Sequence, residues 1–339
     1  MNNKGVSVIC PTYNEGRYVG KVIESVMGQD YHDGKIELIF VDGMSCDDTR
    51  LKILEMSKKY PNIRCIDNTK RIVPVALNIG IENSIYDYVI RVDAHSEYPQ
   101  NYISELLRRK EELGADNVGV CCQTLPVNDS IMAKAIAVGL SSVFGVGNAY
   151  FRIGVDKVRT VDTVPFGCFT KDLFKRIGYF DETLVRNQDD EFNARIIKNG
   201  GKVYLLPGMK VKYYPRDSVG KLFKMYYQYG LFRPLANKRL GHPQSIRKLL
   251  PLFFVIYLAA SMVFSLFSQF VFYQLVVVMM LYVFLGVWSA SKVTGNLKVL
   301  ARMPYVYMAI HISYGIGYIA GILRLLTPVG EPVAVSSSR

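Results

Sequence analysis

The first half of the chain alternates between short apolar runs and segments with helical spacing. Four runs of buried-strand type are expected over residues 6–10, 36–41, 63–66 and 88–92. Apolar residues recur at helical spacing between them, over 19–27, from about Asp47, and over 73–81. Ser45 and Asp48 resemble a capping box for the second of these helices. The alternation predicts a parallel α/β sheet covered by helices on both faces.

The last third of the chain is dominated by apolar segments. Each approaches the roughly 20 residues that a helix needs to cross a bilayer, and none contains Asp, Glu or Lys. We therefore expect three transmembrane helices. They are Leu249–Ser268, Phe270–Ala290 and Tyr305–Leu326. His311 lies within the third, where we expect a neutral imidazole bonded between helices.

These patterns divide the chain into four parts. Residues 1–217 are expected to form one α/β domain, residues 249–326 the membrane domain and residues 327–339 a tail. Residues 218–248 mix basic and aromatic side chains, which suits a helix lying in the membrane interface. A solvated basic helix packed on the α/β domain is the alternative. The segment 130–146 is apolar and rich in Gly and Ala, as in a core helix or one near the membrane.

Basic residues indicate the orientation in the membrane. They gather before the first span (Lys238, Arg239, Arg247, Lys248) and between the second and third (Lys292, Lys298, Arg302). Both groups fall on one side, which the positive-inside rule places in the cytoplasm. The N-terminus shows no signal peptide. We expect a multi-pass protein of the inner (cytoplasmic) membrane, with its first domain on the cytoplasmic face.

The net charge indicates which classes of partner to expect, and the cysteines indicate their own redox state and burial. The formal net charge of +12 favours anionic partners, such as nucleotide diphosphates and the headgroups of membrane lipids. No nucleic-acid module is recognisable, so no nucleic acid is expected. The six cysteines form no CxxC pair and lie mostly in apolar runs, which is typical of reduced core residues.

Polar residues follow the expected strands, where parallel sheets bind ligands. They occupy residues 11–15, 42–48, 67–71 and 93–95. Asn14 and Asp42 suit contacts with a ribose or base, or else simple turn and capping roles. Asp93 and His95, at i and i+2, can both reach one divalent ion that also binds phosphate oxygens. The alternative is a capping aspartate beside an exposed histidine.

Several segments carry a resemblance when taken in order. PTYNE, VDGMSCDDT, ALNIG, an aspartate-x-ligand motif and QDDEF resemble the inverting family 2 glycosyltransferases of GT-A fold. RVDAHSEY, FGVGNAYFR, GYFDETLVRNQDDEFNARI and YYPRDS look like the succinoglycan type, which builds bacterial exopolysaccharide. The resemblance runs from Val6 to about Arg233. It implies a Rossmann-like nucleotide-diphospho-sugar transferase domain followed by transmembrane helices.

The resemblance also implies roles for individual residues. The nucleotide-sugar group is Pro11, Thr12, Tyr13, Glu15, Asp42, Arg71, Asn78 and Asp93. Gly167 and Cys168 fall where the family forms the floor of the acceptor pocket. Asp93 would bind the metal, Mn²⁺ or Mg²⁺, together with His95. The family has Asp-x-Asp at this motif, so His95 is a departure.

The catalytic base follows from the same resemblance. Asp189 falls on the family's catalytic aspartate, which takes the proton from the acceptor hydroxyl as that oxygen attacks the anomeric carbon. Asp190 and Glu191 are rival candidates, and Gln188 replaces the usual glutamate. The alternative is an acidic first helical turn, which the helix dipole favours.

The expected function is transfer of a single sugar in cell-surface polysaccharide synthesis. The donor would be a nucleotide-diphosphate sugar, a UDP-sugar first of all, and the acceptor a saccharide linked to polyprenyl diphosphate. Two alternatives stay open. One is a polyprenyl-phosphate glycosyltransferase, and the other is a non-catalytic scaffold protein of GT-A fold.

Overall fold

The fold is described from a computed structural model of the chain. It describes residues 5–31, 35–242 and 245–327. They fall into two compact units. The strand-rich unit comprises Met1–Gln123 and Gly154–Tyr213, and the helical unit comprises Thr124–Ile153 and Tyr214–Arg339.

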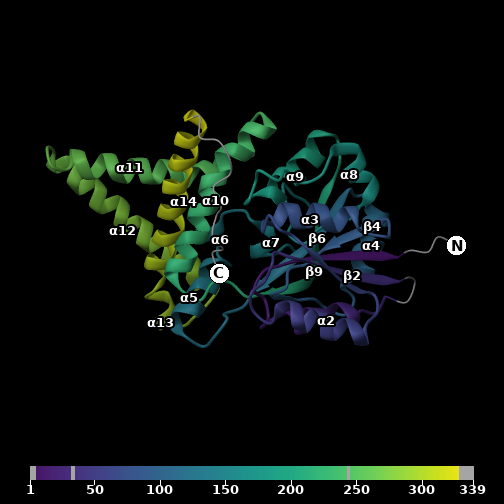
Figure 1. The fold of residues 1–339 in the computed structure, drawn as a ribbon. Helices are drawn as coiled ribbons and strands as arrows, with labels where there is room; N and C mark the ends of the chain where they lie inside the picture. Colours follow the sequence, from purple (N-terminus) through teal and green to yellow (C-terminus); the bar gives the residue numbers. More distant parts are fainter. Residues whose placement is uncertain (1–4, 32–34, 243–244, 328–339) are drawn as a thin grey trace. The chain divides into compact units, whose positions relative to one another are not determined.

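The strand-rich unit is built on one nine-stranded sheet (Figure 1). Its central path runs β3-β2-β1-β4-β8-β6-β9-β5, and β7 pairs with β9. The first four strands are parallel, and the pairs β4–β8, β6–β8, β5–β9 and β7–β9 are antiparallel. The strands are β1 (Val6–Thr12), β2 (Ile36–Asp42), β3 (Ile63–Asp67), β4 (Tyr88–Arg91), β5 (Ser96–Glu97), β6 (Asn117–Thr124), β7 (Arg159–Thr160), β8 (Cys168–Thr170) and β9 (Val203–Tyr213).

Helices cover both faces of the sheet, with α2 on one face and α3 on the other (Figure 1). In α1, the buried residues Val19, Val22, Ile23 and Val26 follow helical spacing, so one stripe packs inward. The helices of this unit are α1 (Val19–Met27), α2 (Thr49–Lys59), α3 (Val73–Glu82), α4 (Tyr102–Leu113), α8 (Lys171–Ile177) and α9 (Gln188–Lys198).

The strand order positions the functional edge. From β1 the chain proceeds through β2 to β3 on one side, and β4 then pairs with β1 on the other side. This reversal between β1 and β4 is the topological switch point, beyond whose carboxyl ends such sheets bind ligands. The expected parallel arrangement of the first four strands is therefore confirmed, while the later strands make the complete sheet mixed.

Two local expectations need correction. The capping box at Ser45 is wrong, because the Ser45 hydroxyl donates to Asp42 at 2.5 Å, and the cap residue Asp48 makes no side-chain capping bond. Cys46 is exposed rather than in the core. Of the other cysteines, Cys65 is half-buried and the remaining four are buried, in keeping with reduced core residues.

Within the part of the chain that the structure describes, the helical unit contains three helices that are long and apolar enough to cross a membrane. They correspond to α11, α12 and α14, with α13 preceding the last. The elements of this unit are α5 (Ile131–Gly139), α6 (Val143–Val146), α7 (Tyr150–Ile153), α10 (Val219–Leu240), the 3₁₀ turn η1 (Ile246–Leu249), α11 (Leu250–Phe264), α12 (Gln269–Ser291), α13 (Leu297–Leu300) and α14 (Met303–Leu326).

Helix α10 packs closely along α14. A Cβ atom added to Gly317 would lie 2.2 Å from the Tyr227 carbonyl oxygen, and one added to Gly230 would lie 2.1 Å from the Tyr314 carbonyl oxygen. Only glycine permits this approach of two helix backbones. The middle of α10, residues 230–234, is buried, and its lysines Lys221, Lys224 and Lys238 are exposed toward its two ends. Neither sequence expectation for residues 218–248 included this partner.

A polar cluster joins three helices of this unit. His311 of α14 bonds to the Tyr282 hydroxyl of α12 at 2.8 Å and to the Phe144 carbonyl oxygen of α6 at 3.0 Å. The carbonyl can only accept, so Nε2 carries a proton, and in the neutral imidazole Nδ1 accepts from the Tyr282 hydroxyl. The two bonds confirm that His311 is bonded between helices, and its neutral state stays a prediction.

The domain ranges expected from the sequence stay a prediction. The two compact units differ from them mainly in residues 124–153, which belong to the helical unit together with residues 214–217. The physical reason is apolar packing. Ala135, Ile136 and Leu140 share a buried cluster with residues of α10 and α14, including Leu222 and Tyr307.

Candidate functional site

The loops after β1 and β2 are bonded to each other at the edge of the sheet. The Asn14 amide nitrogen donates to the Ser45 hydroxyl at 2.8 Å, and the Asn14 side-chain oxygen accepts from the Cys46 amide at 2.9 Å. The Glu15 amide donates to the Thr49 hydroxyl at 2.8 Å. Asn14 has a positive φ of 54°, which asparagine tolerates better than most residues. Pro11, Thr12 and Tyr13 lead into this joined pair of loops.

The side chain of Asp42 holds the loop after β2 in its turn. Its side chain is fully buried, and its two oxygens accept from the Ser45 amide at 3.0 Å and the Ser45 hydroxyl at 2.5 Å. The structure thus gives Asp42 the turn-forming role that was its alternative. Its predicted contact with the nucleotide base stays a prediction.

Arg71 and Asn78 lie at different places around α3. Arg71 is exposed just before the helix, with a φ of 57°. Asn78 is buried, and its side chain donates to the Phe180 carbonyl oxygen at 2.9 Å and accepts from the Phe180 amide at 3.0 Å. Asn78 therefore fastens the loop before α9 to α3. Of the two side chains, only that of Arg71 is exposed to solvent.

The end of β4 brings three charged side chains together. Arg91 is the last residue of β4, and its guanidinium contacts both Asp93 and Asp189. The Nη2 atom lies 3.1 Å from Asp93 Oδ1, while Nη1 donates to Asp189 Oδ1. One cation therefore links the predicted phosphate-side aspartate to the predicted base. Sequence reasoning missed Arg91, although a lone arginine inside an apolar strand was a usable signal.

The electrostatics of this group follow from its burial. Burial raises the pKa of the Asp189 carboxyl above its usual value, and the Arg91 charge opposes this effect without cancelling it. Burial alone would lower the pKa of Arg91, but Asp189 and Asp93 raise it above its ordinary value. The Asp189 side chain still keeps 33% of its surface exposed. That open side is where an acceptor hydroxyl can approach.

The three acidic residues of the first turn of α9 differ in what holds them. Glu191 is buried, and Arg195 donates to both of its oxygens, at 2.9 and 2.8 Å. Arg195 also donates to the carbonyl oxygens of Ile177 and Tyr179, so this pair braces the preceding loop. Asp190 is half-buried. Among the three, Asp189 has the position best suited to a base, because it faces Asp93 across Arg91.

Asp93 and His95 are the candidate metal ligands. Asp93 Oδ2 and His95 Nε2 lie 4.0 Å apart, and Glu15 Oε1 lies 3.5 Å from His95 Nδ1. An ion at about 2.1 Å from each ligand can contact both Asp93 and His95, so the pair fits one divalent ion. Over the described residues, no three His, Cys, Asp or Glu side chains form a complete metal group. The remaining ligands would have to come from elsewhere, such as a diphosphate.

The predicted acceptor residues lie in the interior. Cys168 is fully buried in β8, and burial raises the pKa of its thiol to about 12. Gly167 is also buried, and its carbonyl oxygen accepts from the Arg91 amide at 3.1 Å. Neither residue offers an exposed surface to an acceptor in this structure. Gly167 instead holds the backbone of Arg91 in place, and the acceptor role of both residues stays a prediction.

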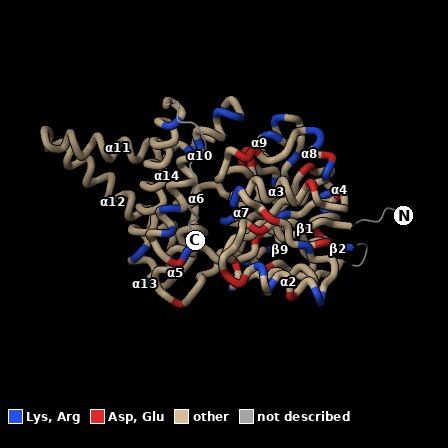
Figure 2. The backbone as a smooth tube through the Cα atoms, in the orientation of Figure 1, with Lys and Arg blue, Asp and Glu red and all other residues tan. Residues whose placement is uncertain are grey.

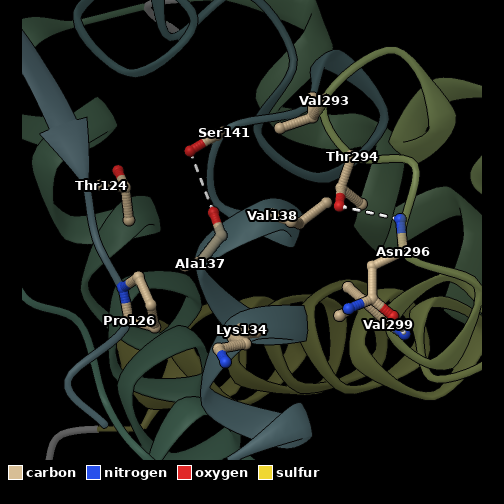
Figure 3. A pocket seen from close by; sticks show the side chains of 10 residues that line it. All are labelled: Thr124, Pro126, Lys134, Ala137, Val138, Ser141, Val293, Thr294, Asn296 and Val299. Atoms are coloured by element: carbon tan, nitrogen blue, oxygen red, sulfur yellow. Dashed lines mark hydrogen bonds between the residues drawn. The ribbon is translucent and has the colours of Figure 1, made fainter. Parts of the chain in front are cut away.

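A separate cavity of about 220 Å³ lies within the helical unit (Figure 3). Its lining includes Lys134, Ser141, Thr294 and Asn296, and Lys134 is the one charged residue among the described residues that line it. Without a carboxylate, this cavity offers no base for group transfer. The candidate active site is therefore the edge of the sheet around Arg91.

Solved structures share the fold. A mannosyltransferase from Pyrobaculum calidifontis, in complex with GDP-Man and Mn²⁺, matches with a TM-score of 0.61 at 17% identity, over 91% of this chain and 86% of that one. Residues 1–349 of TarS from S. aureus, in complex with UDP-GlcNAc, match with a TM-score of 0.51 at 15% identity, over 94% and 92%. Both support the GT-A-like fold of a mixed sheet with helices.

Sequence relatives are closer. The succinoglycan biosynthesis protein ExoA of Rhizobium meliloti (strain 1021) is 30% identical over 249 residues, 72% of this chain and 74% of that protein. A dolichyl N-acetyl-alpha-D-glucosaminyl phosphate 3-beta-D-2,3-diacetamido-2,3-dideoxy-beta-D-glucuronosyltransferase of Methanococcus voltae is 31% identical over 242 residues, 69% and 74% of the two chains. The family model for glycosyl transferase family 2 matches residues 7–177. The chain therefore belongs to glycosyl transferase family 2 and is a sugar transferase.

Proposed function

We propose that this protein transfers a single sugar from a nucleotide-diphosphate sugar to a lipid-linked saccharide, with inversion at the anomeric carbon. The observation that carries the proposal is the group formed by Arg91, Asp93 and Asp189. It sets one carboxylate with an open side opposite a second carboxylate that can face a diphosphate. A single base is what direct displacement by a hydroxyl requires.

The donor end of the site would use the joined loops after β1 and β2 for the nucleoside. Asp93 and His95 would hold a divalent ion, and the ion would neutralise charge on the departing diphosphate. Asp189 would accept the proton from the acceptor hydroxyl. Arg91 would hold Asp189 toward the reacting centre through one oxygen, leaving the other oxygen for the acceptor.

The acceptor class is supported by the apolar helices and by the relatives. Among the described residues, three helices are apolar and long enough for a membrane, and association with a membrane would keep the protein beside an acceptor that stays in the bilayer. The relative from Methanococcus voltae is named for a dolichyl-phosphate-linked sugar, and that from Rhizobium meliloti for succinoglycan biosynthesis. We propose a polyprenyl-diphosphate-linked saccharide as acceptor, a UDP-sugar as donor and a cytoplasmic active site.

Removing divalent metal is expected to abolish transfer. Membranes containing the protein would be incubated with a panel of labelled nucleotide sugars and lipid-linked acceptors, with EDTA or with added Mn²⁺ or Mg²⁺. One donor should give a lipid-extractable product, and EDTA should stop its formation until metal is restored, because uncompensated diphosphate charge slows departure. Transfer that continues unchanged in EDTA would rule out the metal role of Asp93 and His95. A product formed on polyprenyl monophosphate alone would replace the proposed acceptor.

A further inference from the structure

Helices α11 and α12 form a hairpin whose outer part has little protein around it. The two helices are joined by residues 265–268, and the rings of Phe254 and Tyr282 stack 4.9 Å apart near their base. Over the outer part, residues 256–281, Ser261 is the one buried residue. Leu266, Phe267 and Phe270 at the tip are about 80% exposed, at 80%, 83% and 78%. Neither helix carries a Lys, Arg, Asp or Glu (Figure 2).

Helix α14 meets this hairpin at its base. On α12, Tyr282 bonds to His311, and a Cβ on Gly286 would lie 3.0 Å from the Tyr307 ring. On α11, the Pro251 carbonyl oxygen and Val255 approach Gly315 within 2.4 and 2.5 Å of an added Cβ. A 24-residue helix is about 36 Å long, enough to cover the whole hairpin if it ran alongside. Because the outer part of the hairpin is exposed, α14 does not run alongside it.

The far half of α14 packs on α10 instead. A Cβ on Gly321 would lie 2.4 Å from the Leu231 carbonyl oxygen of α10 and 2.9 Å from Pro234. Over half of the apolar window of α14, 56%, is buried, against 11% for α11 and 6% for α12. In the three candidate spans, α14 is therefore the one enclosed by protein, whereas α11 and α12 present bare apolar surface.

The exposed charges of α10 limit where α10 and α14 can lie in a membrane. Lys221, Lys224, Lys238 and Arg239 are all exposed on α10. The stretch between Lys224 and Lys238 is about 21 Å long, shorter than the roughly 30 Å hydrocarbon core. If α14 crossed the bilayer with α10 at its side, exposed cations would be placed in hydrocarbon. At the membrane surface the same cations face anionic headgroups.

We propose that the α11–α12 hairpin alone enters the bilayer, and that α14 lies with α10 along the membrane surface. Exposed Trp288, with Lys292 over its ring at 3.7 Å, lies at the base of the hairpin, as expected at the water interface. An even number of crossings follows, so the end of α14 lies on the same side as the strand-rich unit. A third span would place them on opposite sides.

The test compares three thiols in sealed vesicles of known orientation. A membrane-impermeant maleimide would be applied to the full chain, and each labelled peptide would be scored separately. Native Cys46 is exposed and marks the side of the strand-rich unit. Gly295→Cys is the matched control, because an added Cβ there meets no atom within 4 Å and both topologies place it on the Cys46 side. Thr327→Cys follows α14 and reports the outcome.

We expect Thr327→Cys to be labelled from the same side as Cys46 and Gly295→Cys. A second measurement covers the case in which residue 327 lies too deep for the reagent. An affinity tag after Arg339 would be exposed to protease in the same vesicles, and it should be lost from the Cys46 side. Labelling of Thr327→Cys, or loss of the tag, from the opposite side alone would overturn the proposal.

Discussion

Asp189→Asn is expected to lower kcat by about 10²–10⁴-fold while leaving donor binding largely unchanged. Asparagine keeps the size of the side chain and its contact with Arg91, but it cannot accept a proton from the acceptor hydroxyl. Initial rates of lipid-extractable product at saturating donor and acceptor would measure the loss. Thermal unfolding of the purified variant would establish that the chain still folds.

The neighbouring carboxyls provide the comparison for Asp189. Asp190→Asn tests the rival base one residue along and should keep most of the turnover. Glu191→Gln weakens the bonds with Arg195 that brace the loop before α9, so its effect should appear in thermal stability. The opposite result would make Asp190 the base: Asp190→Asn would lose most of its turnover, and Asp189→Asn would stay active.

Arg91→Gln is expected to reduce kcat on the order of 100-fold, because a displaced catalytic group of this kind costs about that much. Arg91 sits between Asp93 and Asp189, so its loss leaves two carboxylates facing each other and frees Asp189 to move. Arg91→Lys should recover only part of the rate, since an ammonium cannot make the paired contacts of a guanidinium. Steady-state kinetics would separate this loss in kcat from any change in KM.

The dependence of activity on pH provides a second test of the role of Arg91. A base must be deprotonated, so activity falls as pH drops through the pKa of Asp189. Burial raises that pKa and Arg91 lowers it, so in Arg91→Gln the acid limb should move to higher pH. Arg64→Gln is the control, because Arg64 pairs with Glu37 near a cavity at the opposite end of the strands. Equal losses in both variants, with unchanged profiles, would mean that Arg91 acts on folding alone.

Much of the fold could be predicted from the pattern of apolar residues. The runs beginning at Val6, Ile36 and Tyr88 are buried or nearly so and form central strands of the sheet. The run beginning at Ile63 forms the edge strand β3 and is mostly half-buried. The parallel order of these runs puts their polar ends at one edge of the sheet, so the place of the candidate site could be predicted from the sequence. The later, shorter strands, such as β5 and β7, carry two residues each and leave too little pattern to detect.

The individual roles were harder to predict, because they depend on partners distant in sequence. Arg91 and Asp189 are 98 residues apart, and no local pattern announces their contact. Asn78 was expected near the nucleotide, yet Phe180 engages its amide. The packing of α10 on α14 did leave a trace, since Gly317 and Gly321 have the spacing that brings helices together.

The joined loops after β1 and β2 would influence how the proposed donor binds. Asn14, Ser45 and Cys46 tie one loop to the other, and Asp42 fixes the second loop from within the sheet. These bonds come from the chain itself, so a nucleoside bound there as proposed would lose little binding energy to ordering the two loops. The nucleoside of the proposed donor should then bind to a preformed site between these loops, and flexibility of the loops should have little effect on its affinity.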